Sequence, residues 1–575
     1  MITQEMVRDP IEMEVFVNRL LSITEDMNNT LVRSSFSTNI KERKDCSVAL
    51  FDGKGRLVSQ GTQIPLHLGS LNGAVAAVIA RYGLDGIREG DAYICNDPYL
   101  AGGSHLPDVN IVTPVFHEGR LVFFTANVGH HSDFGGVVAG SIAGGLRSIF
   151  AEGLRLPVIR IVQQGVLDED LLNLIANNTR DPEERTLDLK VQIATNERGA
   201  AAISGLIHQM GLEKTLQAVE DVLVYTRRRL LKRIGELKQG SYEFKNWLDD
   251  DGLGDGEPVP ICVRVTVGAE GLEFDFSGSG PEARGAMNLP LNAVHACVYY
   301  AVKALLDPEL SANAGLFEPL SIKLPSASIV NPELPAAVGA RSITAQKVAG
   351  AIFGAFRGVL PEDKIMGAGN DVCPAIVFSG KHQHRKGEFV YLETVGGGAG
   401  ATAGADGMDG VHVHMTNSSN LPVEALENEY PLMVDEYGYV ADSGGAGRRR
   451  GGMALARQIS ALVPGIVFTA RSDSHLVGQP SGALGAEPGR RARLELHHPD
   501  GRIEALPSKA ASIVLQKGQG VRMETPGGGG VGAPSQRSLQ DVERDLVDGV
   551  ISAQAAQEYY AAQMDKLVEQ TEVVS

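Results

Sequence analysis

Two β-type runs separated by a short turn constrain the fold of this chain more than any other feature. The runs are VNIVTPVF at residues 109–116 and RLVFFTANV at residues 120–128, and His117-Glu118-Gly119 joins them. A connection of two or three residues brings such runs together as an antiparallel hairpin. The chain is therefore expected to build a sheet around this hairpin.

The open end of the hairpin collects ionisable side chains. His105 and Asp108 precede its first run, in a Pro- and Gly-rich segment that is typical of an irregular loop, and His130 follows its second run. Counting back from the turn places His130 opposite Leu106 or Pro107. The spacing therefore predicts that the two histidines and the aspartate gather at one point.

A second hairpin is predicted in CSVALFDGKGRLVSQ, residues 46–60, around the turn DGKG. Asp45 comes just before its first arm and therefore lies at its open end, while His67 follows its second arm. If both hairpins share one sheet, Asp45 joins the cluster at the first hairpin.

Two His and two Asp at one point suit a divalent cation such as Zn²⁺ or Mn²⁺, with a position left for water. The alternative is that these residues only cap strands and form hydrogen bonds, because the spacing HxxD is much less specific than HExxH. His131, Asp133 and Asp97 are close enough in sequence to substitute as ligands or to support them.

Other candidate residues have structural explanations. Cys46 could be a nucleophile, but a Cys between strand residues is typical of a small buried hydrophobe. His412 and His414 alternate on one side of a predicted strand and could bind metal, although a polar strand face explains them equally well. Residues 248–257 (LDDDGLGDGE) lack the spacing of a calcium loop and are expected to form a solvated acidic turn.

Glycine clusters at residues 396–410, 442–452 and 524–532 could suggest phosphate binding. The chain has no GxxxxGK[ST] motif, and the clusters lack the strand, helix and acidic residue of a dinucleotide-binding fingerprint. Tight turns and close backbone approach are the favoured interpretation. ATP, if the function requires it, is expected to bind to another polypeptide.

The whole pattern predicts a mixed α/β (α+β), multi-domain protein, because 575 residues exceed what one hydrophobic core holds. Helices are predicted from Pro10, with Asp9 as cap, and across about 167–238. A β-hairpin at 258–280 and a helix at 292–306 follow. The expected units are a β-hairpin-rich N-terminal metal-site domain (1–238), a central α/β domain (239–435), a Gly-rich β domain (436–535) and a C-terminal helical tail (536–575) with two short helices separated at Gly549.

Charge and composition exclude several partners. The formal net charge is −18, from 70 acidic and 52 basic residues, which argues against nucleic acid. Five scattered cysteines fit a reducing compartment. The N-terminus lacks the basic and apolar regions of a signal peptide, and even residues 337–356 are interrupted by charges, so no membrane segment is expected. These features predict a cytoplasmic protein.

Seven stretches in this order resemble the hydantoinase B family from end to end. That family includes B subunits of ATP-dependent hydantoinases, the C-terminal half of 5-oxoprolinases, the caprolactamase β subunit and related acetone carboxylase subunits. The stretches are NIKERKDCSVALFDGKGRLVSQGTQIPLHLGS, GDAYICNDPYLAGGSHLPDVNIVTPVF, IFAEGLRLPVIRI, DFSGSGPEARGAMNLPLNAV, GVHVHMTNSSNLPVEALE, DSGGAGRRRGG and METPGGGGVG.

The resemblance implies a subunit that works with a hydantoinase A-type ATPase subunit, with two copies of each chain. The partner phosphorylates the carbonyl of a small cyclic amide such as a hydantoin, 5-oxoproline or caprolactam, and this chain supplies the metal site. Carried over by motif, the metal ligands and catalytic residues are His105, Asp108 and His130, with Asp45 as fourth ligand. Zn²⁺, Mn²⁺ and Fe²⁺ all suit such ligands.

Two other functions stay open from the sequence. The acetone carboxylase branch of the family implies carboxylation of a phosphorylated enol at a similar metal site, although a chain of 575 residues favours the amidohydrolase branch. The second alternative is a non-catalytic scaffold for an ATPase, with a purely structural His/Asp cluster.

Overall fold

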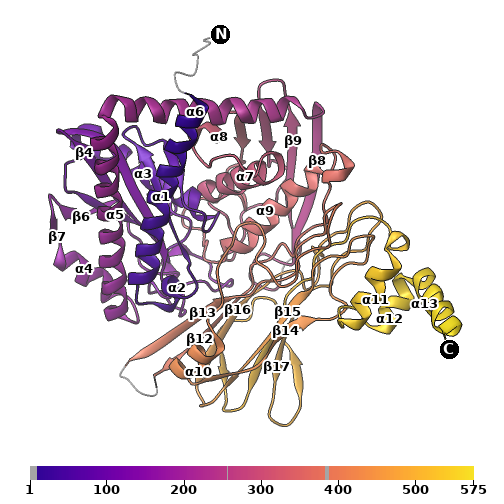
Figure 1. Ribbon diagram of the computed structural model, residues 1–575. Coiled ribbons are helices and arrows are strands. Elements are labelled where there is room, and N and C mark those ends of the chain that lie inside the picture. The colour runs from indigo at the N-terminus through magenta and orange to yellow at the C-terminus, as the bar shows by residue number, and fades with distance from the viewer. Residues whose placement is uncertain (1–8, 256, 383–386, 575) are drawn as a thin grey trace.

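A computed structural model describes residues 9–255, 257–382 and 387–574 and has the predicted mixed α/β architecture (Figure 1). An N-terminal sheet with its helices, a second sheet and a β-sandwich follow one another along the chain. Three C-terminal helices lie together beside the sandwich, in yellow in Figure 1.

The first sheet contains both predicted hairpins, β1–β2 and β4–β5. All its strands pair antiparallel, in the order β2-β1-β5-β4-β3-β6-β7. Because β1 pairs with β5, the open ends of the two hairpins lie at the same end of the sheet. The strands are β1 Cys46–Asp52, β2 Leu57–Gln60, β3 Ala92–Cys95, β4 Asp108–His117, β5 Arg120–His130, β6 Ile159–Gln163 and β7 Val166–Leu167.

Helices cover both faces of this sheet, which explains its nearly continuous apolar strands. Val48 and Leu50 of β1 pack in one core with α1, whereas Ala49 and Phe51 point to the other face and pack in a core with α3. Asp9 caps α1 as predicted, by accepting from the N–H of Ile11. The helices of this part are α1 Pro10–Ser34, α2 Thr38–Lys41, α3 His67–Tyr82, α4 Glu169–Ala176, α5 Pro182–Met210 and α6 Leu212–Gly235.

The register predicted for the β4–β5 hairpin was wrong by one or two residues. Phe116 pairs with Leu121 but Val115 pairs with Phe123, so a bulge adds one residue to β5. His130 consequently lies directly opposite Asp108, rather than opposite Leu106 or Pro107. The bulge brings the two ionisable residues closer together than the sequence count did.

The second sheet begins at Gly240 and has the order β11-β10-β9-β8. The predicted hairpin is β9–β10, and the predicted helix is α7. One hydrophobic core runs from α3 through α7 and α9 to this sheet. Its elements are β8 Gly240–Leu248, β9 Val259–Val267, β10 Leu272–Asp275, β11 Leu320–Lys323, α7 Leu291–Leu306, α8 Ala314–Phe317 and α9 Arg341–Phe356.

The third part is a sandwich of two antiparallel sheets around a shared core. One sheet has the order β13-β12-β16-β19 and the other β14-β15-β20-β17-β18. The elements are β12 Ala375–Lys381, β13 Glu388–Thr394, α10 Val423–Glu429, β14 Leu432–Val440, β15 Ala454–Ala461, β16 Ile466–Arg471, β17 Arg493–His497, β18 Ile503–Ala505, β19 Ile513–Leu515 and β20 Gly520–Glu524.

The C-terminal tail contains three helices where two were predicted. They are α11 Leu539–Val547, α12 Ala553–Tyr559 and α13 Ala561–Val574. Gly549 separates the first two, as expected, with φ of 70°. The extra break falls at Tyr560, whose buried hydroxyl accepts a hydrogen bond from the N–H of Gly447. This long-range contact has no local sequence signal.

All five cysteines are buried and unpaired. In the described part of the chain, each helix falls short of the length or the apolar character needed to cross a membrane.

The glycine clusters bring backbone segments into direct contact with one another. The N–H of Gly528 donates to the carbonyl of Gly452, and the N–H of Gly452 donates to the carbonyl of Ala399. A Cβ atom on Gly528 would lie 1.9 Å from the carbonyl oxygen of Ala399. Close backbone approach, one of the two roles predicted for these glycines, is confirmed.

Gly451→Ala is expected to destabilise the sandwich strongly. The added Cβ would lie 1.8 Å from the carbonyl oxygen of Gly528, so two backbone segments must separate. We expect a loss of about 3 kcal/mol or more, measured by denaturant unfolding. Gly438→Ala is the matched control, because nothing lies within 4 Å of its Cβ position. Equal stability of the two variants would contradict the packing argument.

Candidate metal centre

The predicted site residues lie at the end of the first sheet where both hairpins open, beside the ends of its inner strands β1, β4 and β5. His105 lies in the loop before β4, Asp108 begins β4 and His130 ends β5. Asp45 precedes β1, and its carbonyl accepts a hydrogen bond from the N–H of His130 at 2.9 Å. The sheet therefore fixes the backbone of the cluster through ladder hydrogen bonds.

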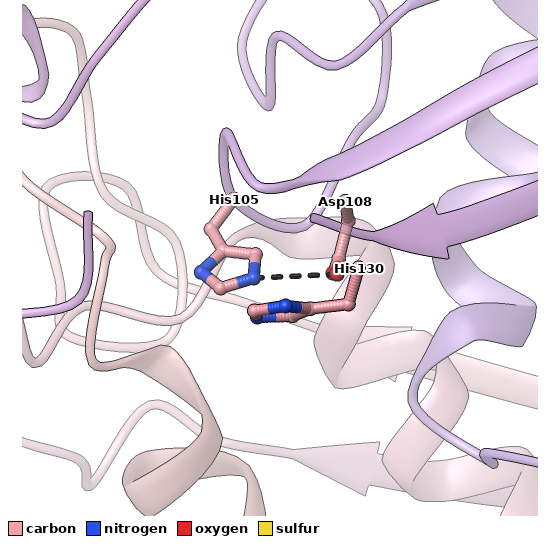
Figure 2. Close-up of side chains that lie close together, drawn as sticks. All are labelled: His105, Asp108 and His130. Atoms are coloured by element: carbon pink, nitrogen blue, oxygen red, sulfur yellow. Dashed lines mark ion pairs between the residues drawn. The ribbon is translucent and has the colours of Figure 1, made fainter. Parts of the chain in front are cut away.

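Three of the four predicted residues bring ligand-type atoms together. One such atom each from His105, Asp108 and His130 lies within 4.8 Å of the others, and all three side chains are buried. The Nε2 atom of His105 is 3.3 Å from Oδ1 of Asp108. Figure 2 shows both imidazole rings beside the carboxylate.

Two buried atoms of this group lack hydrogen-bond partners: Nε2 of His105 and Oδ1 of Asp108. The Nδ1 atom of His105 lies 3.3 Å from the carbonyl oxygen of Gly339, so the proton of a neutral ring belongs on Nδ1. Burial, with repulsion from Arg341, lowers the pKa of His105 to about 4. A nitrogen lone pair therefore faces a carboxylate oxygen, an arrangement that a cation stabilises.

Asp108 is held as a carboxylate. Burial opposes its ionisation, but His105, Arg341 and His67 together keep its pKa well below the usual range, and the charge of Arg341 persists when the imidazole of His105 is neutral. Arg341 donates from Nη2 to Oδ2 at 2.5 Å, and the hydroxyl of Ser104 donates to the same oxygen. These contacts occupy Oδ2 and leave Oδ1 directed at the histidines.

His130 is held as a neutral ring. Burial lowers its pKa well below the usual range, although the charge of Asp108 opposes this effect. Asn39 lies 3.4 Å from its Nδ1 atom, and Asn39 itself accepts a hydrogen bond from Arg43. A neutral imidazole is the form that binds metal.

His67 belongs to this site, although the sequence did not select it. Its Nε2 atom lies 3.6 Å from Oδ1 of Asp108 and 3.6 Å from Oδ1 of Asp45. Ser47 contacts its Nδ1 at 3.0 Å and orients the ring. The sequence feature that could have identified His67 is its position shortly after the β1–β2 hairpin. Asp45 thus contacts the group of three through His67 and pairs with Arg43 at 3.6 Å.

The residues considered as substitute ligands have partners of their own. Nε2 of His131 contacts Gln192 at 3.0 Å. Asp133 pairs with Arg180 at 2.6 Å, and Asp97 pairs with Arg155 at 2.7 Å. These pairs stabilise the loops around the site.

Two other predictions can be compared with the structure. Cys46 is fully buried, and burial raises the pKa of its thiol, which favours the structural interpretation over the nucleophile. The strand predicted around His412 and His414 was wrong, because Val411 forms only an isolated bridge and His414 lies in a turn with φ of 53°. His414 pairs with Asp371 at 2.8 Å, while His412 contacts Thr416.

The interpretation of residues 248–257 as a solvated acidic turn was wrong for its first two aspartates. Asp249 is buried and accepts hydrogen bonds from the backbone N–H groups of residues 475–477. Asp250 is buried and pairs with Lys509 at 3.2 Å. Both anchor the sandwich to the second sheet, a long-range role that local sequence does not indicate.

A cavity of about 620 Å³ lies between α1, α7 and residues 58–65. Its lining is mainly apolar and contains none of the three clustered residues. The candidate metal centre therefore rests on its donor set and not on the shape of this cavity.

Glu152 supports the site by holding the backbone segment that contacts His105. Its Oε1 accepts from the N–H groups of Val338 and Gly339, and the carbonyl of Gly339 is the partner of His105. Burial raises the pKa of Glu152 from 4.5 to about 8, against the effect of these hydrogen bonds. The side chain is therefore protonated in the folded protein at neutral pH.

In the Glu152→Gln variant, the free energy of unfolding is expected to lose the pH dependence that ionisation of Glu152 contributes. The raised pKa means that the folded state holds a proton that the unfolded state releases above pH 4.5, so this contribution falls as pH rises toward about 8. The stability of the parent relative to the variant should fall by roughly 1.4 kcal/mol per pH unit in this range. Thermal unfolding at several pH values measures it, with exposed Glu89→Gln as control. A constant difference would contradict the assignment.

The fold and the buried cluster define a class: multi-domain mixed α/β proteins with a candidate metal centre where inner strands of an antiparallel sheet end. Residues 9–534 match the family described as Hydantoinase B/oxoprolinase. The chain belongs to this family, and the resemblance predicted from its motifs is confirmed.

Individual relatives agree with this assignment. The 5-oxoprolinase 1 of Arabidopsis thaliana is 33% identical over 561 residues, which cover 92% of this chain but only 42% of the relative. The chain thus spans about two fifths of the length of that protein. The crystal structure of ATP-dependent caprolactamase from Pseudomonas jessenii has a TM-score of 0.89 at 27% identity and covers 96% of each chain. Nucleotide-free acetone carboxylase shares the fold, with a TM-score of 0.88 at 19% identity, over 99% of this chain and 84% of that one.

Proposed function

We propose that this chain is the metal-holding subunit of an ATP-dependent hydrolase that opens a small cyclic amide. The observation that carries the proposal is the pair of unpartnered buried atoms on His105 and Asp108, beside His130. Family membership and the names of the relatives, 5-oxoprolinase and ATP-dependent caprolactamase, supply the reaction class. The substrate is a hydantoin, 5-oxoproline or a lactam.

His105, Asp108 and His130 would hold the cation, with Asp45 and His67 close by as further ligands. With such an ion bound, these residues would provide a site where water is deprotonated near neutral pH. Zn²⁺, Mn²⁺ and Fe²⁺ all suit imidazole and carboxylate donors.

The chain's own residues position the donors and exclude water. Gly339 fixes the ring of His105 through Nδ1, and Arg341 with Ser104 fixes the carboxylate of Asp108. Such supporting contacts hold ligands in productive geometry. Burial of the cluster keeps bulk water away from an activated substrate.

ATP is proposed to act through a hydantoinase A-type ATPase partner, with two copies of each chain. The sequence has no P-loop motif, yet the chain matches an ATP-dependent caprolactamase chain over nearly its whole length. Phosphorylation of the amide oxygen by the partner would make the carbonyl carbon electrophilic. Addition of water to that carbon, cleavage of the C–N bond with a proton passing to the nitrogen, and hydrolysis of the resulting acyl phosphate by a second water would give the amino acid and inorganic phosphate.

Elemental analysis of the purified chain tests the proposal. We expect close to one equivalent of Zn, Mn or Fe in the parent and loss of the metal in Asp108→Asn. The control is Asp91→Asn, because Asp91 lies in the same part of the fold, is also buried and also pairs with an arginine, Arg160. Absence of metal from the parent after supplementation would favour the scaffold alternative.

A further inference from the structure

Arg471, the last residue of β16, is a buried cation without a carboxylate partner. Only 3% of its surface is exposed. Its Nη1 atom donates to the carbonyl of Gly339 at 2.7 Å, and its Nε atom has no hydrogen-bond partner. Within the described residues, no acidic oxygen lies within 4.0 Å of its guanidinium nitrogens. Burying such a charge is costly unless a ligand or an ion pair compensates it.

Arg471 lies directly beside the candidate metal centre. The carbonyl of Gly339 that accepts its hydrogen bond also contacts Nδ1 of His105. Burial lowers the pKa of Arg471 to about 10; Cys373 and Asp45 oppose this effect, and repulsion from Arg341 and Arg43 adds to it. The guanidinium therefore experiences the positive charges of the same site.

Two further buried arginines surround the centre. Arg341 pairs with Asp108, and Arg43 lies 3.6 Å from Asp45 and donates to Thr394 and Asn39. The Nε atom of Arg43 has no hydrogen-bond partner either. Three guanidinium groups thus face two carboxylates, and a bound divalent cation would increase the positive excess.

The start of helix α9 adds to this field. The helix has 16 residues and begins at Arg341, with no side chain capping its N-terminus. The positive end of the helix dipole favours an anion there. The planar fork of an arginine matches the oxygens of a phosphate or carboxylate.

We propose that Arg471, with Arg43 and the start of α9, binds an oxyanion group of the ligand beside the metal centre. The group is either the phosphoryl group that activates the amide or a carboxylate carried by the substrate. The identity of this ligand rests on the proposed function, whereas the anion site itself rests on the unpaired buried arginine.

Calorimetric titration of the full chain with inorganic phosphate tests the proposal, after treatment with EDTA and at constant ionic strength. We expect Arg471→Gln to weaken phosphate binding by about tenfold or more, because the substitution removes a forked pair of charge-assisted hydrogen bonds. Arg471→Lys keeps the charge without the fork and should bind with intermediate affinity. Exposed Arg493→Gln is the matched control in the same sandwich and should bind like the parent. Acetate in a parallel titration distinguishes a carboxylate site from a phosphoryl site.

The thermal unfolding midpoint without ligand separates a binding role from a structural one. A structural Arg471 would lower the midpoint when replaced by Gln, whereas a binding cation without a partner should leave it unchanged or raise it. No binding of either anion by the parent, or equal binding by Arg471→Gln, would overturn the proposal. Anion binding by a chain that takes up no metal would support the arginine site and remove the proposed function. A chain that takes up metal but binds neither anion would support the proposed function and overturn the arginine site.

Discussion

Replacement of Asp108 by Asn in the assembled enzyme is expected to reduce ring opening of the cyclic amide by about 10³-fold or more. Loss of a residue that merely supports a ligand costs roughly 10–100-fold, and Asp108 is proposed to be a ligand itself. Its Oδ1 accepts no hydrogen bond, so the substitution would act mainly on the proposed bond to the cation. Turnover of 5-oxoproline or a lactam with ATP and the partner subunit measures the effect.

The choice of Asn separates chemistry from folding. Asn keeps the shape of Asp108, and its amide oxygen can still accept hydrogen bonds from Arg341 and Ser104. Ala would instead leave the buried Arg341 without a carboxylate partner, with the hydroxyl of Ser104 as its remaining acceptor. Asp91→Asn in the same complex is the control for loss of a buried, arginine-paired carboxylate. Full turnover by Asp108→Asn, in a complex of normal composition, would refute the role of the cluster.

The backbone arrangement of the site could be predicted from local sequence because short turns fix strand pairing. Two residues join β4 to β5 and four join β1 to β2, which leaves little choice of partner. The open ends of the two hairpins then collect His105, Asp108 and His130. The register could not be counted, because the bulge near Val115 depends on packing rather than on a turn motif.

The residues that complete the site come from distant parts of the chain. Arg341 is 233 positions from Asp108, and Thr394 is 351 positions from its partner Arg43. No spacing rule connects such pairs, so sequence reasoning identified the donors but not their supports. The same limit explains Asp249 and Tyr560, whose partners lie on other elements.

The purified chain alone is expected to show no hydrolysis of ATP and no ring opening, with both activities restored by an ATPase subunit. An unstrained amide is a poor electrophile, so a nucleophile at the proposed centre would lack a reactive carbon until the carbonyl oxygen is phosphorylated. The sequence offers no P-loop to perform that step, and the glycine clusters are occupied by backbone packing. Removal of the ATPase subunit is therefore expected to abolish both activities almost completely.

Separate assays of the two steps make this expectation decisive. Release of phosphate from ATP and opening of the ring are measured for the chain, the partner and their mixture. Asp108→Asn in the mixture should stop ring opening while leaving assembly intact, because the proposed role of the carboxylate is confined to the second step. ATP hydrolysis by the parent chain alone would contradict the division of labour. Ring opening by the Asp108→Asn mixture would instead move the nucleophile to the partner and leave this chain as a scaffold.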